Sequence, residues 1–314
     1  MVKIFSLPPH ENWICDRFLE EWNQHNPDII TQDLNEADIN WILAGWQWNK
    51  IPVEFLREKT TVLTVHHIVP DKFDEQKKDA FMQRDQFIDW YHVPCYNTED
   101  QIREYTDKPI FVQPFWANQF IWYNIEDKED LRKSLGLPKD AYIIGSFQRD
   151  TEGHDLKSPK LEKGPDRFVE IVAKMRKTMT MKKFFVVLAG PRRQYVINRL
   201  ASLNIPYEYF EFVEFETLNE LYNCLDLYIV SSRYEGGPQS VIECALTKTP
   251  IISTRVGVAS QFLPYNSLYN SVDDFQSAWM AESNVDFAYN SVMRHKIPNG
   301  FKPFRGFFES ILAP

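Results

Sequence analysis

Cysteine is scarce in this chain of 314 residues, and long apolar runs are missing. The cysteines lie far apart, with no C-x-x-C pair, which argues against a disulfide framework or a cysteine metal site. They are Cys15, Cys95, Cys224 and Cys244. No segment offers the roughly 18 consecutive apolar residues of a membrane span, and the apolar run at residues 2–6 is too short for a signal peptide. We therefore predict free, mostly buried thiols and a cytoplasmic location.

Basic residues are fewer than acidic ones in this chain. The formal net charge is -9, from 35 lysines and arginines against 44 aspartates and glutamates. Net charge therefore does not hold this chain to nucleic acid or to an anionic membrane, although a local basic patch and a peripheral membrane contact remain compatible with it. The chain is long enough for two domains that each bury a core. We predict a globular protein of two domains without a nucleic-acid partner.

Short apolar runs alternate with helical patterns along the chain, which is typical of βαβ units and parallel sheets. The first half predicts strands at residues 2–6, 41–44, 61–66, 87–91 and 110–112, with helices at 15–22, 77–86 and 98–105. The second half predicts strands at 142–147, 184–189, 209–213, 227–230 and 250–253, with helices at 164–177, 194–203, 217–223 and 239–247. Further helices are expected at 128–135, 272–281, 285–294 and 305–312. The fold class is α/β, with Rossmann-like sheets.

The most informative segment has two carboxylates, Glu235 and Glu243, with seven residues between them. A buried strand precedes it, and the helix at 239–247 follows Pro238, which suits a helix start because proline has no N–H to leave unpaired. Gly236 and Gly237 leave backbone amides uncovered at this helix start, where the helix dipole favours an anion such as phosphate. The segment therefore predicts an anion site.

The two carboxylates differ in position. Glu235 lies in the loop ahead of the helix, whereas Glu243 lies nearly two turns inside it. They can therefore face different parts of one elongated ligand. Taken alone, the same pattern also suits a tight strand-to-helix turn with solvated carboxylates.

The surroundings of the motif favour a ligand site. Residues 231–234, residues 249–254 and the pair Val256-Gly257, together with the motif itself, closely resemble the donor-binding half of family 4 glycosyltransferases, over about residues 142–263. The resemblance implies the GT-B fold, in which two Rossmann-like domains face each other across a cleft. We expect an acceptor-side domain at 1–122, a nucleotide-sugar domain at 123–299, and a last helix at about 300–314 that packs back on the first domain.

The resemblance also implies roles for the motif residues. Glu235 would bind the hydroxyls of the donor sugar and Glu243 those of the ribose, while the amides of Gly236 and Gly237 would hold the diphosphate. Backbone groups of the loops near two further residues would hold the base. The candidates for this contact are Gly190 and Val213.

Family 4 enzymes place an arginine and a lysine after the first strand of the second domain to neutralise the diphosphate, and Arg149 and Lys163 match them. The family spacing is only a few residues, whereas here a long segment intervenes. That segment carries Lys157 and Lys160, so Lys160 can take the role given to Lys163. Arg149 emerges directly from a strand end and is the firmer assignment.

The first domain matches the family less well. His66 and His67 end a strand and resemble the family segment whose histidine lies near the donor sugar; we favour His66, since successive strand residues face opposite ways. The family's glycine-rich loop is missing, because residues 7–12 contain no glycine. Trp46 and Trp48 form a candidate platform for stacking an acceptor sugar, although aromatic residues are more often core.

The expected activity is that of a retaining hexosyltransferase that needs no cofactor. The donor would be a nucleotide-diphosphate sugar, UDP- or GDP-linked, and the acceptor a hydroxyl of a glycan or glycolipid, as in polysaccharide biosynthesis. No metal is expected, because no Asp-x-Asp pair of the kind that metal-using glycosyltransferases need is suitably placed. The alternatives are a nucleotide-sugar epimerase of the same fold and a non-catalytic sugar-binding protein.

Overall fold

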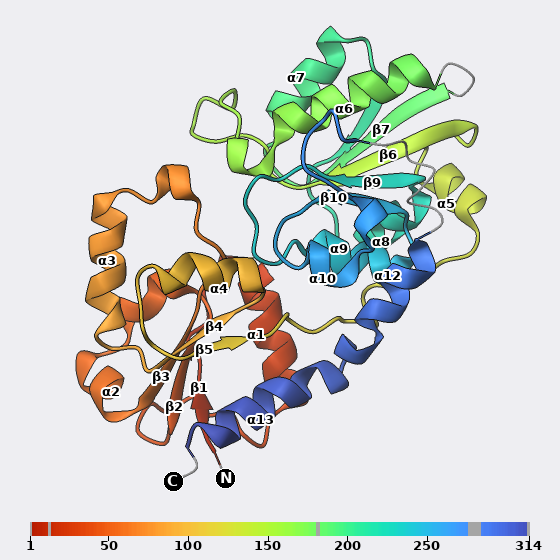
Figure 1. Ribbon diagram of the computed structural model, residues 1–314. Coiled ribbons are helices and arrows are strands. Elements are labelled where there is room, and N and C mark those ends of the chain that lie inside the picture. The colour runs from red at the N-terminus through yellow and green to blue at the C-terminus, as the bar shows by residue number, and fades with distance from the viewer. Residues whose placement is uncertain (1, 12–13, 180–182, 276–283, 313–314) are drawn as a thin grey trace. The chain divides into compact units, whose positions relative to one another are not determined.

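The computed structural model describes residues 2–11, 14–179, 183–275 and 284–312 (Figure 1). The chain divides into two compact units: unit 1 comprises Met1–Trp116 and Ile297–Pro314, and unit 2 comprises Ala117–Lys296. Each unit is built on one parallel β-sheet that is covered by helices. The predicted α/β class with two Rossmann-like halves is therefore confirmed.

The division between the units falls after Trp116, whereas the sequence places it after residue 122. The difference has a packing cause. Trp122 is buried in unit 2, where its ring meets those of Phe215 and Tyr222 at centroid distances of 6.0 and 5.7 Å. The Tyr123 N–H also donates to the side chain of Asn219 at 3.1 Å. The segment that follows Trp116 therefore belongs to the second core.

Unit 1 contains a sheet of five parallel strands in the order β1-β2-β3-β4-β5. Ile4 of β1 pairs with Ile39 of β2 and also bridges Ile30, so the strand order reverses at β1. The elements, with η marking 3₁₀ helices, are β1 (Ile4–Phe5), α1 (Ile14–His25), β2 (Ile39–Ile42), η1 (Gly45–Lys50), α2 (Val53–Glu58), β3 (Thr60–Thr64), η2 (Pro70–Lys72), α3 (Glu75–Asp85), β4 (Trp90–Val93), α4 (Tyr96–Arg103), β5 (Ile110–Val112), η6 (Asn299–Phe301) and α13 (Lys302–Ser310).

Alternating side chains give this sheet two cores. Trp41 of β2 packs with residues of α1 and α13, whereas its neighbour Ile42 packs with residues of α2, α3 and α4. The first core is unusually aromatic. Trp22 of α1 meets Phe304 and Phe308 of α13, and Phe111 stacks on Phe307 at 4.2 Å. These rings attach the C-terminal helix to unit 1.

Unit 2 contains a sheet of six parallel strands in the order β11-β10-β9-β6-β7-β8. The sixth strand, β11, was not predicted, because a strand of two residues carries no alternation. The elements are α5 (Lys128–Ser134), β6 (Ala141–Phe147), η3 (Leu161–Lys163), α6 (Pro165–Thr178), β7 (Lys183–Ala189), α7 (Gln194–Ser202), β8 (Tyr207–Phe210), α8 (Phe215–Cys224), β9 (Leu227–Val230), α9 (Gln239–Thr247), β10 (Ile251–Thr254), α10 (Ala259–Phe262), η4 (Tyr265–Ser267), β11 (Leu268–Tyr269), α12 (Val285–Val292) and η5 (Met293–His295). The helix expected at 272–281 lies largely outside the described residues.

An apolar core joins α6 and α7 to one face of this sheet, while α8 and α9 lie on the other face (Figure 1). The four cysteines are free and buried, as predicted. In the described ranges, every helix is too short or too polar to cross a bilayer.

Candidate functional site

The segment between β9 and α9 forms the predicted turn at a helix start. Pro238 is the N-cap of α9, and Gln239 is its first helical residue. Within the described residues, the backbone N–H groups of Gly236 and Gly237 donate to no acceptor. Two adjacent amides at the start of a helix of this length can bind an anion.

The turn is supported from behind by the loop that follows β10. The N–H of Val258 donates to the carbonyl of Gly236 at 3.0 Å. Gly257 has a φ of +51°, and a Cβ there would lie 2.1 Å from that same carbonyl oxygen. Only glycine fits such a close approach with a positive φ, so Gly257 holds the turn in place.

Glu235 forms an ion pair with Lys163 beside this turn. Both side chains are largely buried, at 11% and 19% exposure. The hydroxyl of Ser232 donates to Glu235 Oε1 at 3.2 Å, and the amide of Gln148 donates to the Lys163 carbonyl at 2.9 Å. The first glutamate of the motif is therefore held between segments that follow β6 and β9.

Packing of η3 against the end of β9 brings Lys163 to this position. Gly164 has a φ of +63°, and a Cβ there would lie 1.9 Å from the carbonyl oxygen of Ser231. Arg233 forms a bidentate ion pair with Asp166 at 2.7 and 2.6 Å. Among the three candidate lysines, Lys163 is thus the one that meets the motif.

The other two lysines lie elsewhere. Lys160 pairs with the buried Glu162 at 3.5 Å. Lys157 is exposed in the loop that precedes η3. The three lysines therefore differ in their partners, a difference that the sequence did not predict.

Arg149 follows the end of β6 and donates from Nε to the carbonyl of Thr151 at 3.1 Å. Next to it, Asp150 and Arg193 form an ion pair of 2.7 Å in which both side chains are fully buried. Arg193 also donates to the carbonyl of Ala189 at 3.0 Å. Sequence reasoning missed this pair, which connects the carboxyl ends of β6 and β7.

Glu243 projects from α9 and is only 7% exposed. The hydroxyl of Tyr222, on α8, donates to Glu243 Oε2 at 2.7 Å. Burial, and next the Glu243 carboxylate, raise the pKa of Tyr222 well above its usual range, so the hydroxyl remains a donor. The two glutamates of the motif thus have different partners, which agrees with different roles.

The two residues expected near the base lie at the ends of β7 and β8. Gly190 has a φ of +91°, its N–H donates to the Phe210 carbonyl at 3.1 Å, and its carbonyl accepts from the Tyr209 hydroxyl at 3.1 Å. Val213 is half-buried in the loop between β8 and α8. The start of the loop after β7 is therefore hydrogen-bonded to the end of β8.

In unit 1, the predicted histidine faces protein groups. His66 Nε2 lies 3.0 Å from the Leu43 carbonyl and 3.4 Å from Cys15 Sγ. Burial lowers the pKa of His66 to about 4, so the ring is neutral at pH 7. His67 is half-buried.

The loop without glycine, which follows β1, is closed by a carboxylate. Asp16 accepts from the N–H groups of His10 and Glu11 at 2.8 and 2.9 Å. On the nearby η1, Trp46 is 53% exposed, whereas Trp48 is half-buried and stacks on Phe87 at 5.8 Å. Of the two platform candidates, Trp46 presents the more open ring.

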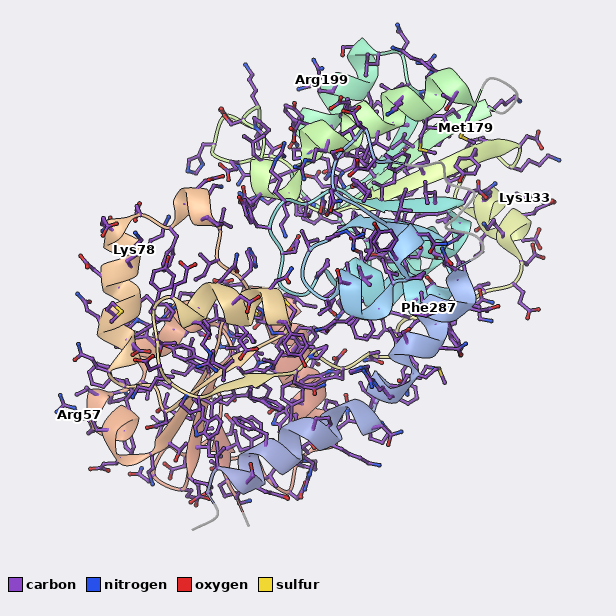
Figure 2. The ribbon with its side chains drawn as sticks, viewed as in Figure 1. Arg57, Lys78, Lys133, Met179, Arg199 and Phe287 are labelled. Atoms are coloured by element: carbon purple, nitrogen blue, oxygen red, sulfur yellow. The ribbon has the colours of Figure 1, made fainter. Side chains whose placement is uncertain are left out.

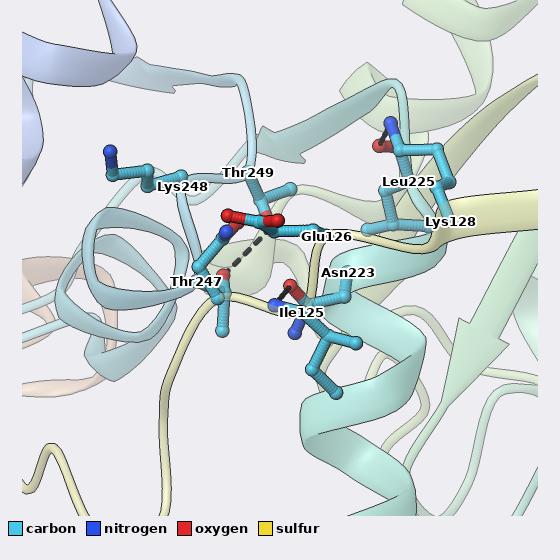
Figure 3. A pocket seen from close by; sticks show the side chains of 9 residues that line it. Ile125, Glu126, Lys128, Asn223, Leu225, Thr247, Lys248 and Thr249 are labelled. Atoms are coloured by element: carbon cyan, nitrogen blue, oxygen red, sulfur yellow. Dashed lines mark hydrogen bonds between the residues drawn. The ribbon is translucent and has the colours of Figure 1, made fainter. Parts of the chain in front are cut away.

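A pocket of about 300 Å³ lies at the opposite ends of the unit 2 strands (Figure 3). Its lining includes Leu225 and Thr249, which precede β9 and β10. Lys128 donates there to the Leu225 carbonyl at 2.6 Å, and the hydroxyls of Thr247 and Thr249 pair at 2.7 Å. Open α/β sheets bind ligands at the carboxyl ends of their strands, so this pocket is separate from the candidate site.

Comparisons with known proteins agree with the fold. The GT-B glycosyltransferase fold is shown by solved structures, all of low sequence identity. HepE from Anabaena, solved with UDP and glucose, has a TM-score of 0.74 at 12% identity, with 99% of each chain covered. Sucrose-phosphate synthase from Thermosynechococcus elongatus has a TM-score of 0.68 at 16% identity, covering 88% of this chain and 74% of that one.

A third structure, a UDP-forming trehalose-phosphate synthase from Burkholderia xenovorans, has a TM-score of 0.65 at 10% identity, covering 95% of this chain and 86% of that one. A search of curated proteins finds no match. Residues 127–266, which hold the turn, Arg149, Lys163 and both glutamates, match the model of the family described as glycosyl transferases group 1.

Proposed function

We propose that this chain is a retaining glycosyltransferase that moves a hexose from a nucleotide-diphosphate sugar to a hydroxyl of a glycan or glycolipid. The family match over residues 127–266 supports glycosyl transfer. The observation that carries the proposal is the turn before α9, where the amides of Gly236 and Gly237 have no acceptor among the described residues and lie next to the Glu235–Lys163 pair. These groups suit a phosphorylated sugar.

The diphosphate would bind at this turn. The two glycine amides and the dipole of α9 favour its negative charge, and Arg149 and Lys163 add cationic side chains at the same edge of the sheet. Cleavage of the bond between the sugar and the phosphate develops further charge on the diphosphate. Donors that are already in place stabilise that charge more in the transition state than in the ground state. This stabilisation requires no metal.

The glutamates would orient the rest of the donor. Glu235 would accept hydrogen bonds from sugar hydroxyls, with Ser232 and Lys163 holding its carboxylate. Glu243 would accept from the ribose hydroxyls, with Tyr222 as its fixed neighbour. Neither glutamate acts as a glycosidase acid or base.

Retention would follow from attack on the face that the diphosphate leaves. The acceptor oxygen forms the new bond to the anomeric carbon while the bond to the phosphate oxygen breaks. The leaving phosphate oxygen takes the proton of the acceptor hydroxyl. Charge and atoms balance without a covalent enzyme intermediate.

The remaining candidate residues would contact other parts of the donor and the acceptor. The loops at Gly190 and Val213, together with Lys160, would border the nucleotide, and UDP is the first candidate because HepE structures contain UDP and UDP-glucose. His66 and Trp46 would serve the sugar and the acceptor from unit 1. We also propose a cytoplasmic location, where nucleotide sugars are made available.

Nucleotide binding and turnover in two variants test the proposal. The native protein is first screened by thermal shift against UDP, GDP, ADP and their sugars, because a bound ligand raises the melting temperature. Arg149→Ala should lower turnover by about 10²–10³-fold with a smaller change in nucleotide affinity. Glu243→Ala should weaken nucleotide affinity by about 10–100-fold. Arg199→Ala, an exposed arginine on α7, is the matched control (Figure 2).

Three outcomes would contradict the proposal. The reverse pattern in the two variants would overturn the assigned roles. Conversion of the nucleotide sugar without any acceptor would identify an epimerase. Binding without nucleotide release, across a panel of mixed acceptors, would identify a sugar-binding protein.

A further inference from the structure

We propose that Arg192 supplies to the diphosphate, alongside Arg149, a second cation that no carboxylate among the described residues offsets. This inference rests on the proposed function and adds a residue that the family pattern does not predict. Arg192 lies in the loop between β7 and α7, next to the fully buried Arg193. Three observations carry it: the charge balance at the site, the way the Arg192 backbone is held, and the state of its side chain.

The first observation is the charge balance. The diphosphate of a nucleotide sugar is a dianion, so a site with one uncompensated cation leaves part of the charge unmatched. Lys163 is paired with Glu235, and Lys160 with Glu162, so each lysine is offset by a carboxylate. No carboxylate among the described residues pairs with Arg149. One more unpaired cation at this edge of the sheet would match the second negative charge.

The second observation is the backbone of Arg192. Its carbonyl accepts from the N–H groups of both Asp150 and Thr151, at 3.2 and 3.1 Å. The loop after β7 is thus fixed to the segment that carries Arg149. β6 and β7 are neighbouring parallel strands, so both loops emerge at the same carboxyl edge. Arg192 also has a φ of 61°, a left-handed conformation that residues with a side chain rarely adopt outside functional or tightly constrained positions.

The third observation is the guanidinium itself. Across the described ranges, no hydrogen bond, ion pair or ring contact engages the Arg192 side chain, although its Nε is buried. Two other arginines nearby are matched by carboxylates: Arg193 pairs with Asp150, and Arg233 with Asp166. A partly desolvated charge without a partner is unfavourable, and an anionic ligand would relieve it. The fork of an arginine also suits a phosphate oxygen pair.

Calorimetric titration of the full chain with inorganic pyrophosphate, UDP and UMP tests the inference. Arg192→Gln keeps a polar side chain with the same Cβ and Cγ and removes the charged guanidinium. It should weaken UDP and pyrophosphate binding by about 10–100-fold, as expected for a lost charge-assisted hydrogen bond. The affinity for UMP, which lacks the second phosphate, should fall by less than about threefold. The UDP affinity of Arg192→Lys should lie between those of Arg192→Gln and the native protein, since lysine keeps the charge and loses the forked guanidinium.

Arg199→Gln, on the exposed face of α7, is the matched control and should bind all three ligands as the native protein does. The melting temperatures of all variants show whether a loss of binding comes from misfolding. A larger loss of UDP affinity in Arg192→Gln than in Arg192→Lys would identify the charge as the cause.

Other results would overturn the inference in distinguishable ways. If Arg192→Gln binds UDP as Arg199→Gln does while Arg149→Ala loses affinity or turnover, the diphosphate site stands without Arg192. If UDP and UMP weaken equally, Arg192 serves the nucleoside or the fold. If the native protein binds neither pyrophosphate nor UDP, GDP or ADP, the proposed function itself fails.

Discussion

The carboxyl ends of the strands differ between the two units. In unit 1, the loop amides of His10 and Glu11 donate to the carboxylate of Asp16. In unit 2, the amides of Gly236 and Gly237 have no acceptor within the described part of the chain. Native proteins satisfy almost all of their buried polar groups. The same architecture is thus closed by the protein's own groups in one unit and left open for a ligand in the other.

The sheets themselves do not explain this difference. Both consist of parallel strands. What differs is the partner: a side chain of the same unit meets the loop of unit 1, whereas unit 2 presents Arg149 and Arg192 without a carboxylate partner among the described residues. Unsatisfied groups are therefore a better guide to a ligand site than the fold.

The variant with the largest expected effect changes Gly257, which holds the turn of unit 2 in place. Gly257→Ala places a Cβ 2.1 Å from the Gly236 carbonyl oxygen at a positive φ, so the turn has to shift. We expect a loss of about 3–4 kcal/mol in the free energy of unfolding, from the left-handed conformation plus overpacking. Nucleotide binding should be lost with it. Urea unfolding by circular dichroism and UDP titration measure the two effects.

Gly136→Ala is the matched control for this change. Gly136 has a similar φ of +69°, but nothing lies within 4 Å of a Cβ built there. It should cost about 1 kcal/mol and leave UDP binding intact. Equal effects of the two alanines would mean that backbone strain, and not contact with the turn, sets the loss.

The closed character of unit 1 also predicts a pH dependence. His92 is 1% exposed, and burial lowers its pKa to about 3. In the unfolded chain the ring gains a proton below its ordinary pKa of 6.5, whereas the folded ring stays neutral. Acid therefore favours the unfolded state, and the stability due to neutral His92 is present above about pH 6.5 and falls below it. From pH 7 to pH 5 the loss is about 2 kcal/mol.

His92→Gln should flatten this slope by that amount, and the exposed His154→Gln in unit 2 is the control. Tryptophan fluorescence during urea unfolding reports mainly on unit 1, because all tryptophans except Trp122 and Trp279 belong to it. Identical slopes for His92→Gln and the native chain would assign the acid sensitivity to another group.

Local features of the fold were predictable from the sequence. Strand β9 and helix α9 have the predicted bounds, because an apolar run, a glycine pair and a proline lie close together in the sequence. The turn that we propose as the diphosphate site is contained in that same segment. Features that depend on a few adjacent residues leave a clear pattern.

Contacts between distant segments were not predictable. Lys163 meets Glu235 only because β6 pairs with β9, and Asp150 meets Arg193 only because β6 pairs with β7. No local spacing encodes such pairing. The burial of the tryptophans was equally hard to predict: Trp41 is core and Trp46 is exposed, although they lie at the two ends of the same short segment. Burial depends on which helix later covers a strand, and α13 comes from the far end of the chain.

The smallest predicted effect concerns the loop of unit 1, and it tests the difference between the two units directly. Asp16→Ala removes the acceptor of two exposed loop amides, which water can then satisfy, so the free energy of unfolding should fall by only about 1 kcal/mol, like the loss of a helix cap. UDP affinity should stay within about twofold of the native value, because the diphosphate contacts that we propose all lie in unit 2.

Asp74→Ala, which removes the N-cap of α3 in the same unit, is the matched control for a loss of that size. Fluorescence-detected unfolding and UDP titration of both variants give the result. If Asp16→Ala weakened UDP binding as strongly as Arg192→Gln while Asp74→Ala did not, the loop of unit 1 would belong to the nucleotide site, and the division between a closed and an open unit would be wrong.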